Sequence, residues 1–199
     1  MTGLRYVALG DSYTIGTSVA EADRWPNQLV ARLPVGRLRL RANLAVNGAT
    51  SRYVIRRQLP GLASLRPTFA SLLVGVNDVV QEVTSDAFRA NVATILDALV
   101  VGLSPRGVVV VSTPDYTVTP EGAQYGAPSA RRAAIVAFNG IVAELARERG
   151  VAFVDILDLS ELAGDDPSLV ARDGLHPSRA QYGLWVDRIA PVVETLLDR

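Results

Sequence analysis

A serine stands directly after the first apolar segment of the chain, in the sequence Gly10-Asp11-Ser12-Tyr13. A serine hydroxyl is a poor nucleophile and attacks a carbonyl carbon only when a general base takes its proton. Gly, Asp and Ser are also frequent turn residues, so the segment taken alone slightly favours a simple turn. Ser12 is therefore a candidate nucleophile whose base must come from another part of the chain.

The only histidine of the chain, His176, can supply that base, three residues after Asp173 in Asp173-Gly174-Leu175-His176-Pro177. In a turn, this spacing lets the carboxylate accept a hydrogen bond from the imidazole Nδ1. Such a carboxylate fixes the tautomer and stabilises the imidazolium that forms when the base takes a proton. The alternatives are a surface Asp–His pair or an aspartate that caps the next helix.

Two further segments offer hydrogen-bond donors for an oxyanion. Asn77 follows an apolar run in Gly75-Val76-Asn77-Asp78, and Gly48 lies in Val46-Asn47-Gly48-Ala49-Thr50. An amide donor aimed at a developing oxyanion stabilises the transition state by about 3–4 kcal/mol. The simpler alternatives are a loop in which Asn77 and Asp78 bind their own backbone, and an ordinary Asn-Gly turn.

The composition narrows the possible chemistry. Without cysteine the chain has no disulfide, cysteine nucleophile or thiolate metal site, and without lysine it has no Schiff base or phosphate-loop lysine. One histidine leaves too few ligands for a zinc deacetylase, so no metal and no cofactor is expected. A formal net charge of zero gives no basic field for nucleic acid.

Apolar runs typical of strands alternate with amphipathic patterns typical of helices. The expected strands are Arg5–Leu9, Leu38–Val46, Thr68–Val74, Val108–Val111 and Val151–Ile156. Helices are expected over Asn27–Leu33, after Pro26, over Ser51–Leu59, ending near Pro60-Gly61, and over Ser129–Arg149. A further helix is expected to begin at Ser85, and one of its faces is apolar, with Phe88, Val92, Ile95, Leu96 and Leu99. The last expected helix is Gln181–Leu197, with a perturbation at Pro191.

This alternation predicts one α/β domain over residues 1–199: a doubly wound, flavodoxin-like, mostly parallel five-stranded sheet with helices on both faces. Sheets of this kind bind ligands beyond the carboxyl ends of their strands, which is where the four polar segments are expected to meet. The longest expected loop, Thr113–Pro128, follows a central strand, and its use as a lid is left open.

In order and spacing, these segments resemble the blocks of the SGNH hydrolase superfamily, the GDSL-type esterase/lipase family. The resemblance implies that Ser12 is the nucleophile and Asp173 and His176 complete the triad, with an oxyanion hole from the Ser12 and Gly48 N–H groups and the Asn77 side chain. Many members have a small residue or a serine directly before the glycine that corresponds to Gly48, whereas this chain has Asn47 there. Asp11 and Asp78 are interpreted as structural. The Gly-x-Ser-x-Gly of α/β-hydrolases is absent.

The expected substrate is a small or short-acyl ester, because no long exposed apolar segment suggests a lid for a lipid surface. Alternatives within the superfamily are a carbohydrate O-acetyl esterase, a thioesterase or a lysophospholipase. Alternatives of another class are a catalytically silent carbohydrate- or protein-binding domain and, with no phosphate-binding glycine motif, a disfavoured nucleotide-binding domain. The substrate pocket is expected to include Tyr13, Val76, Pro114, Tyr116 and Leu175, and Tyr116 and Tyr125 could stack on a sugar or line an acyl groove.

The first residues lead directly into the serine motif and show no secretion signal, and no apolar run reaches the about 20 residues of a membrane span. The expected compartment is the cytoplasm, although a signal peptide that has been removed would leave no trace. The oligomeric state is left open by the sequence.

Overall fold

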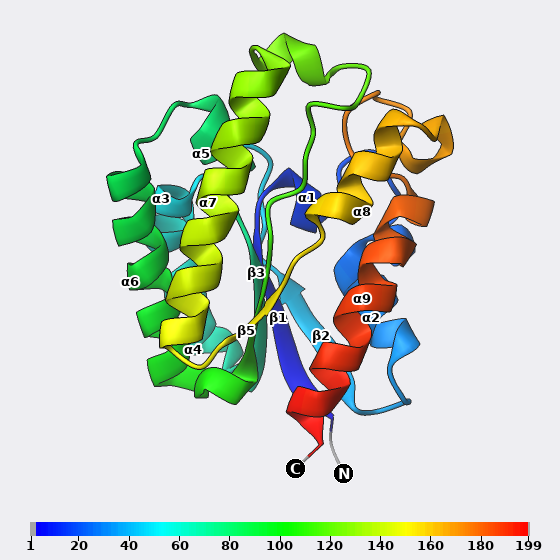
Figure 1. Cartoon of the computed structure of the whole chain (residues 1–199). Helices are drawn as coiled ribbons and strands as arrows, with labels where there is room; N and C mark the ends of the chain where they lie inside the picture. Colours follow the sequence, from blue (N-terminus) through cyan, green and yellow to red (C-terminus); the bar gives the residue numbers. More distant parts are fainter. Residues whose placement is uncertain (1–2, 199) are drawn as a thin grey trace.

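A computed structural model of the chain describes residues 3–198, and its centre is a single five-stranded sheet. All neighbouring strands run parallel, in the order β2-β1-β3-β4-β5 (Figure 1). The strands are β1 (Leu4–Gly10), β2 (Leu38–Asn43), β3 (Phe69–Leu73), β4 (Val108–Val111) and β5 (Ala152–Val154). The predicted fold class is confirmed, and the order places the topological switch point between β1 and β3.

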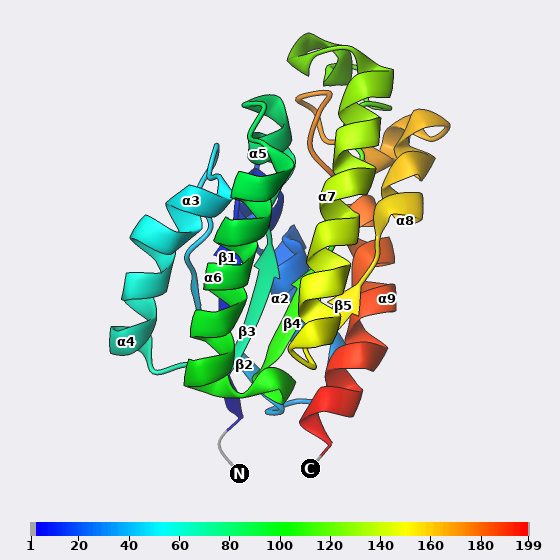
Figure 2. The same cartoon turned by 60° about the vertical axis from the view of Figure 1, so that its left-hand side comes forward.

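Helices cover both faces of the sheet, as Figures 1 and 2 show. On one face α2 (Trp25–Arg32) packs against α9 (Arg179–Leu197), with α8 (Leu157–Glu161) beside α9. On the other face lie α3 (Ser51–Tyr53), α4 (Leu62–Leu65), α6 (Ser85–Leu103) and α7 (Pro128–Glu148). Right-handed crossovers between parallel strands require this two-sided arrangement.

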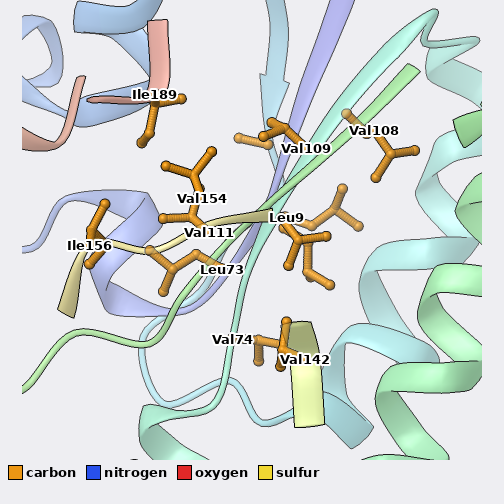
Figure 3. Close-up of a cluster of buried hydrophobic side chains, with 14 of the residues drawn as sticks. Leu9, Leu73, Val74, Val108, Val109, Val111, Val142, Val154, Ile156 and Ile189 are labelled. Carbon is orange, nitrogen blue, oxygen red and sulfur yellow. The ribbon is translucent and has the colours of Figure 1, made fainter. Parts of the chain in front are cut away.

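The core is the apolar contact between the sheet and the two helix layers. Every residue of β3 and β4 is buried, which explains their uninterrupted apolar runs. Figure 3 shows Ile189 of α9 and Val142 of α7 approaching the strands from opposite faces. All five apolar residues predicted for one face of α6 are buried. Each fully buried Leu or Val contributes about 1.5–3 kcal/mol relative to exposure.

The second and fifth strands are shorter than predicted. β2 ends at Asn43 rather than Val46, because the Asn43 side chain turns the chain away from a regular ladder. Its Oδ1 accepts from the Ala45 N–H at 3.1 Å, and its Nδ2 donates to the Thr14 carbonyl at 2.8 Å. β5 covers only Ala152–Val154 of the range predicted for it. Both strands lie at the edges of the sheet, where one neighbour is missing.

The helical segment after β2 differs from its prediction. α3 continues through a π-helical turn (Val54–Gln58) and a 3-10 turn (Leu59–Gly61) into α4. The predicted stop near Pro60-Gly61 is wrong because Pro60 lies at the start of a new turn, where a missing N–H costs nothing. Three short helices were not predicted: α1 (Ser12–Ile15), α5 (Val76–Val80) and α8. α2 begins at Trp25, one residue before the predicted proline, and α9 runs through Pro191.

Candidate active site

The turn between β1 and α1 presents Ser12 at the carboxyl edge of the sheet. Gly10 has a φ of 151°, and a Cβ there would lie 2.3 Å from the Leu73 carbonyl oxygen, so only glycine fits. Ser12 is the first residue of α1, and the Asp11 carboxylate caps this helix by accepting from the Tyr13 N–H at 3.0 Å. Burial raises the pKa of Asp11 to about 7, with the Tyr13 hydrogen bond opposing the shift.

Gln58, in the π-helical turn that follows α3, fixes the end of β1. Its Oε1 accepts from the Gly10 N–H at 2.9 Å, and its Nε2 donates to the Gly10 carbonyl at 2.7 Å. The side chain is buried and comes from the π-helical turn, a feature often found at functional sites. The amide therefore bonds both backbone groups of Gly10 at a point where β2 has ended, and the Val46 N–H also donates to the Gly10 carbonyl, at 3.4 Å. Nothing in the sequence pattern marked Gln58 for this position.

Asp173 and His176 form the predicted pair. The Asp173 Oδ2 lies 2.7 Å from the His176 Nδ1, and its Oδ1 accepts from the N–H groups of Leu175 and His176 at 3.0 Å each. Ser18 donates its hydroxyl to the same Oδ2 at 2.6 Å. Burial alone would raise the pKa of Asp173, but the hydrogen bonds, led by that from Ser18, hold it well below its usual value. The carboxylate is thus ionised at neutral pH and bonds four donors.

Ser18 and Thr17 connect the serine turn to two distant segments, and the sequence analysis missed both. Besides the Ser18–Asp173 bond, the Thr17 hydroxyl donates to the Asn47 Oδ1 at 2.7 Å. Ser18 holds a φ of 66°, an unusual value for a residue with a side chain. Such strain persists only where the surroundings fix the backbone. The segment after α1 therefore links the turn that carries Ser12 to the Asp173–His176 pair.

Asn77 and Asp78 attach α5 to the segment around Gly48. The Asn77 Nδ2 donates to the Ala49 carbonyl at 3.0 Å, which leaves its second N–H free to face a ligand. The buried Asp78 carboxylate accepts from the Ser51 N–H at 2.8 Å and from its hydroxyl at 2.5 Å. Within the described residues, the N–H groups of Ser12 and Gly48 have no acceptor. The residues that carry these three donors, Ser12, Gly48 and Asn77, line the same pocket.

These segments enclose a pocket with a cavity volume of about 170 Å³. It contains four residues predicted to carry the chemistry, together with most of the predicted walls; its lining residues are Ser12, Tyr13, Asn47, Gly48, Val76, Asn77, Val80, Tyr116, Tyr125, Leu175 and His176. Pro114, predicted as a wall, is not among them. It lines a small neighbouring cavity instead, which shares Tyr116 and His176 with the pocket. Asn47 and Val80 were not predicted.

Ser12 and His176 line this pocket from the start of α1 and from the segment before α9. Ser12 is 8% exposed, and the Tyr13 ring packs against the imidazole with centroids 5.1 Å apart and planes tilted by 47°. No hydrogen bond joins the Ser12 hydroxyl to His176 within the described residues. Such bonds are often long without substrate and tighten in the Michaelis complex.

Within residues 3–198, no three or more carboxylate or imidazole side chains gather in an arrangement that could hold a metal ion. No helix within the same residues combines the length and apolar character needed to span a membrane.

The sequence model of the GDSL-like lipase/acylhydrolase family matches residues 8–184, nearly the whole chain. The chain belongs to this family. It is therefore a hydrolase of the GDSL (SGNH) type, as its serine, glycine, asparagine and histidine segments predicted. No curated protein matches the chain.

Solved structures of this GDSL-type fold match along nearly their full length. A W→I variant of Axe2, an acetyl xylan esterase from Geobacillus stearothermophilus, has a TM-score of 0.75 and 19% identity, with 96% of this chain and 95% of that chain covered. TesA has a TM-score of 0.74 and 22% identity, with 96% and 99% covered. LAE5, an alpha/beta hydrolase enzyme from the metagenome of Lake Arreo, Spain, has a TM-score of 0.72 and 19% identity, with 98% of this chain and 97% of that chain covered. These likenesses show a shared fold.

Three further Axe2 structures that match this GDSL-type chain are catalytic mutants. One replaces a serine by alanine, one an aspartate and one a histidine. In Axe2, that aspartate and that histidine lie three positions apart.

Proposed function

We propose that this chain is a serine esterase that hydrolyses small, short-acyl esters through an acyl-enzyme on Ser12. The observation that carries the proposal is the 2.7 Å contact between Asp173 and His176 beside the pocket that Ser12 also lines. The catalytic mutants of Axe2 support it, because their aspartate and histidine have the same spacing as Asp173 and His176. The triad follows the chain order Ser, Asp, His.

In the first half-reaction, the Ser12 Oγ attacks the ester carbonyl carbon while the His176 Nε2 takes its proton. The carbonyl oxygen becomes an oxyanion, and the Ser12 N–H, the Gly48 N–H and the free Asn77 N–H donate to it. The tetrahedral intermediate collapses when the bond to the alcohol oxygen breaks, and His176 returns the proton to that oxygen. Asp173, held ionised by its four hydrogen bonds, stabilises the imidazolium between these two transfers.

The second half-reaction repeats the sequence with water. His176 takes a proton from a water molecule as its oxygen attacks the acyl carbon, and the same three donors bind the new oxyanion. The bond to the Ser12 Oγ then breaks, Ser12 regains the proton from His176, and the carboxylic acid leaves. No step requires a metal ion or an organic cofactor.

Asn77→Ala is expected to lower kcat about 100-fold with little change in KM, because the donor acts on the oxyanion rather than on the ground-state ester. Steady-state kinetics with p-nitrophenyl acetate measure both constants. Asn91→Ala is a matched control, since Asn91 also donates its amide next to this site, to the Ser51 hydroxyl, yet lies outside the pocket. Equal kcat for Asn77→Ala and the wild type would remove Asn77 from the oxyanion hole.

The size of the pocket supports a short acyl group. Its volume of about 170 Å³ lies below the range of about 300–1,000 Å³ that is common for larger ligands. Val76, Val80 and Leu175 give it apolar walls, and the buried Tyr116 ring adds to them. Burial of a short alkyl group there is favourable, whereas a long chain meets the walls.

An acyl-length series tests the proposed function. We expect kcat/KM for p-nitrophenyl acetate and butyrate to exceed that for the octanoate by tenfold or more, since each unaccommodated methylene is worth about 1–3 kcal/mol. Acetylated xylo-oligosaccharides, acyl-thioesters and lysophospholipids in the same panel separate the alternatives within the superfamily. Absence of turnover across the whole panel would instead favour a catalytically silent binding domain.

A sugar acetate is the second candidate substrate. Tyr125 is 40% exposed at the rim of the pocket and meets the buried Tyr116 edge-on, with ring centroids 6.1 Å apart. An exposed aromatic face beside a small acyl pocket suits a sugar ring on the alcohol side of an acetyl ester. Deacetylation of xylo-oligosaccharides faster than that of p-nitrophenyl acetate would favour this substrate.

A further inference from the structure

Arg131, in the first turn of α7, uses its three guanidinium nitrogens to hydrogen-bond two other segments of the chain. Nε donates to the Tyr125 carbonyl at 2.9 Å, and Nη1 donates to the Val79 carbonyl at 2.7 Å. Nη2 donates to the Glu82 carboxylate at 3.0 Å. The side chain is 18% exposed, far less than most arginines.

The segments that Arg131 joins carry two sides of the pocket. Val76, Asn77 and Val80 reach the pocket from α5, the helix whose Val79 carbonyl accepts from Arg131. Tyr125 lines the pocket from the segment between β4 and α7. One guanidinium therefore fixes the distance between α5 and the Tyr125 backbone.

The backbone on either side of Arg131 is shaped to admit the guanidinium. Gly126 has a φ of 120°, and a Cβ at this position would lie 2.3 Å from the Arg131 Nε. Glu82 has a φ of 57°, which is uncommon for a residue with a side chain. For a residue with a side chain, such as Glu82, this conformation costs about 1–3 kcal/mol and persists where neighbouring contacts determine it. The position of the guanidinium is thus tightly specified.

Tyr125 is the pocket residue that depends most on Arg131. It is 40% exposed, whereas Tyr116, Val76 and Tyr13 are almost fully buried and held by packing. Its ring makes the edge-on contact with Tyr116, and its carbonyl is bound by Arg131. With that bond removed, this partly exposed residue keeps only the 3-10 turn that it ends (Gly122–Tyr125) and its ring contact with Tyr116.

We propose that Arg131 determines the acyl-length limit of this esterase by holding Tyr125 against α5 across the pocket. Arg131 is then a specificity-determining residue that acts through positioning, since it does not line the pocket itself. The inference rests on the proposed function. Without Arg131 the wall opens, and longer acyl groups gain access to the space that Tyr125 closes.

The test compares kcat/KM for p-nitrophenyl octanoate with that for the acetate in four variants. Arg131→Ala and Tyr125→Ala are each expected to raise the octanoate-to-acetate ratio about tenfold, because both remove the same wall. Arg131→Lys keeps the charge but loses the three-way geometry, so a smaller rise is expected. Arg149→Ala is the matched control: this arginine at the other end of α7 is also 18% exposed and also bonds a carboxylate and a carbonyl.

A double-mutant cycle completes the test. If Arg131 acts through Tyr125, Arg131→Ala adds less than twofold to the ratio once Tyr125 is alanine. An unchanged ratio in folded Arg131→Ala or Arg131→Lys, or an equal rise in Arg149→Ala, would overturn the inference and leave the esterase proposal intact. If Arg131→Ala does not fold, the Arg131→Lys and Tyr125→Ala ratios decide in its place. No turnover of any ester by the wild type would instead refute the proposed function, and the inference with it.

Discussion

Replacing Ser12 by alanine is expected to lower kcat/KM for p-nitrophenyl acetate by about 10⁵-fold, to a rate set by the remaining donors and by binding alone. The physical reason is that Ser12 carries the one aliphatic hydroxyl among the residues that line the pocket. The other side chains of the lining are a histidine assigned as base, two asparagines, three tyrosines and apolar residues. Steady-state kinetics measure the loss, with thermal unfolding as the check on folding.

Ser160→Ala is a suitable control for this variant. Ser160 is buried like Ser12 and makes its own hydrogen bonds, to Asp115 and Leu157, but it does not line the pocket. It is expected to lose stability rather than turnover per folded molecule. Ser12→Ala with turnover within tenfold of the wild type would show that another group is the nucleophile.

Asp173→Asn is expected to lower kcat about 10⁴-fold while the site keeps its shape. The asparagine oxygen can still accept from the N–H groups that now bond Asp173, but its amide nitrogen cannot accept from the His176 Nδ1. The imidazole then takes the wrong tautomer, and the imidazolium loses its counter-charge. The fall in kcat, measured with p-nitrophenyl butyrate, should come with only a small change in KM.

Ser18→Ala gives the comparison for this loss. It removes one of the four donors to Asp173 and keeps the carboxylate, so the expected fall in kcat is only about tenfold, close to the worth of one charge-assisted hydrogen bond. Similar kinetic losses for Asp173→Asn and Ser18→Ala would show that the negative charge contributes little to the reaction. Ser18→Gly, which also relieves the φ of 66°, separates the lost hydroxyl from backbone strain.

The sheet could be predicted because its strands are marked by burial. β4 is wholly apolar, β3 is apolar except for Ser71, and β1 is buried from Tyr6 onward; the alternation of these strands with amphipathic helices leaves few other folds. The end of β2 could not be predicted, because it depends on hydrogen bonds between the Asn43 side chain and the backbone of Thr14 and Ala45. One-turn helices such as α1 and α5 are too short to show a period, so contacts such as Asp78–Ser51 define them.

The site was predictable only where residue type carries the chemistry. Ser12, Gly48, Asn77 and His176 were predicted from the sequence to lie at one edge of the sheet, and they line one pocket. Residues that hold them in place were not predictable, because their partners are far away in the chain. Ser18 and Asp173 are 155 positions apart, Gln58 and Gly10 are 48, and Arg131 and Val79 are 52. Each is a common polar residue whose importance comes from what it contacts.

The role of Ser12 as the nucleophile is tested most directly by locating the covalent adduct of a fluorophosphonate, by mass spectrometry of the digested protein. We expect one adduct per chain, on the peptide that contains Ser12. It should form rapidly in the wild type and at least 1,000-fold more slowly in His176→Ala, since a serine without its base is a poor nucleophile (about 10³–10⁶-fold for loss of a triad member). An adduct on a different residue, or equal labelling of Ser12→Ala, would contradict this role.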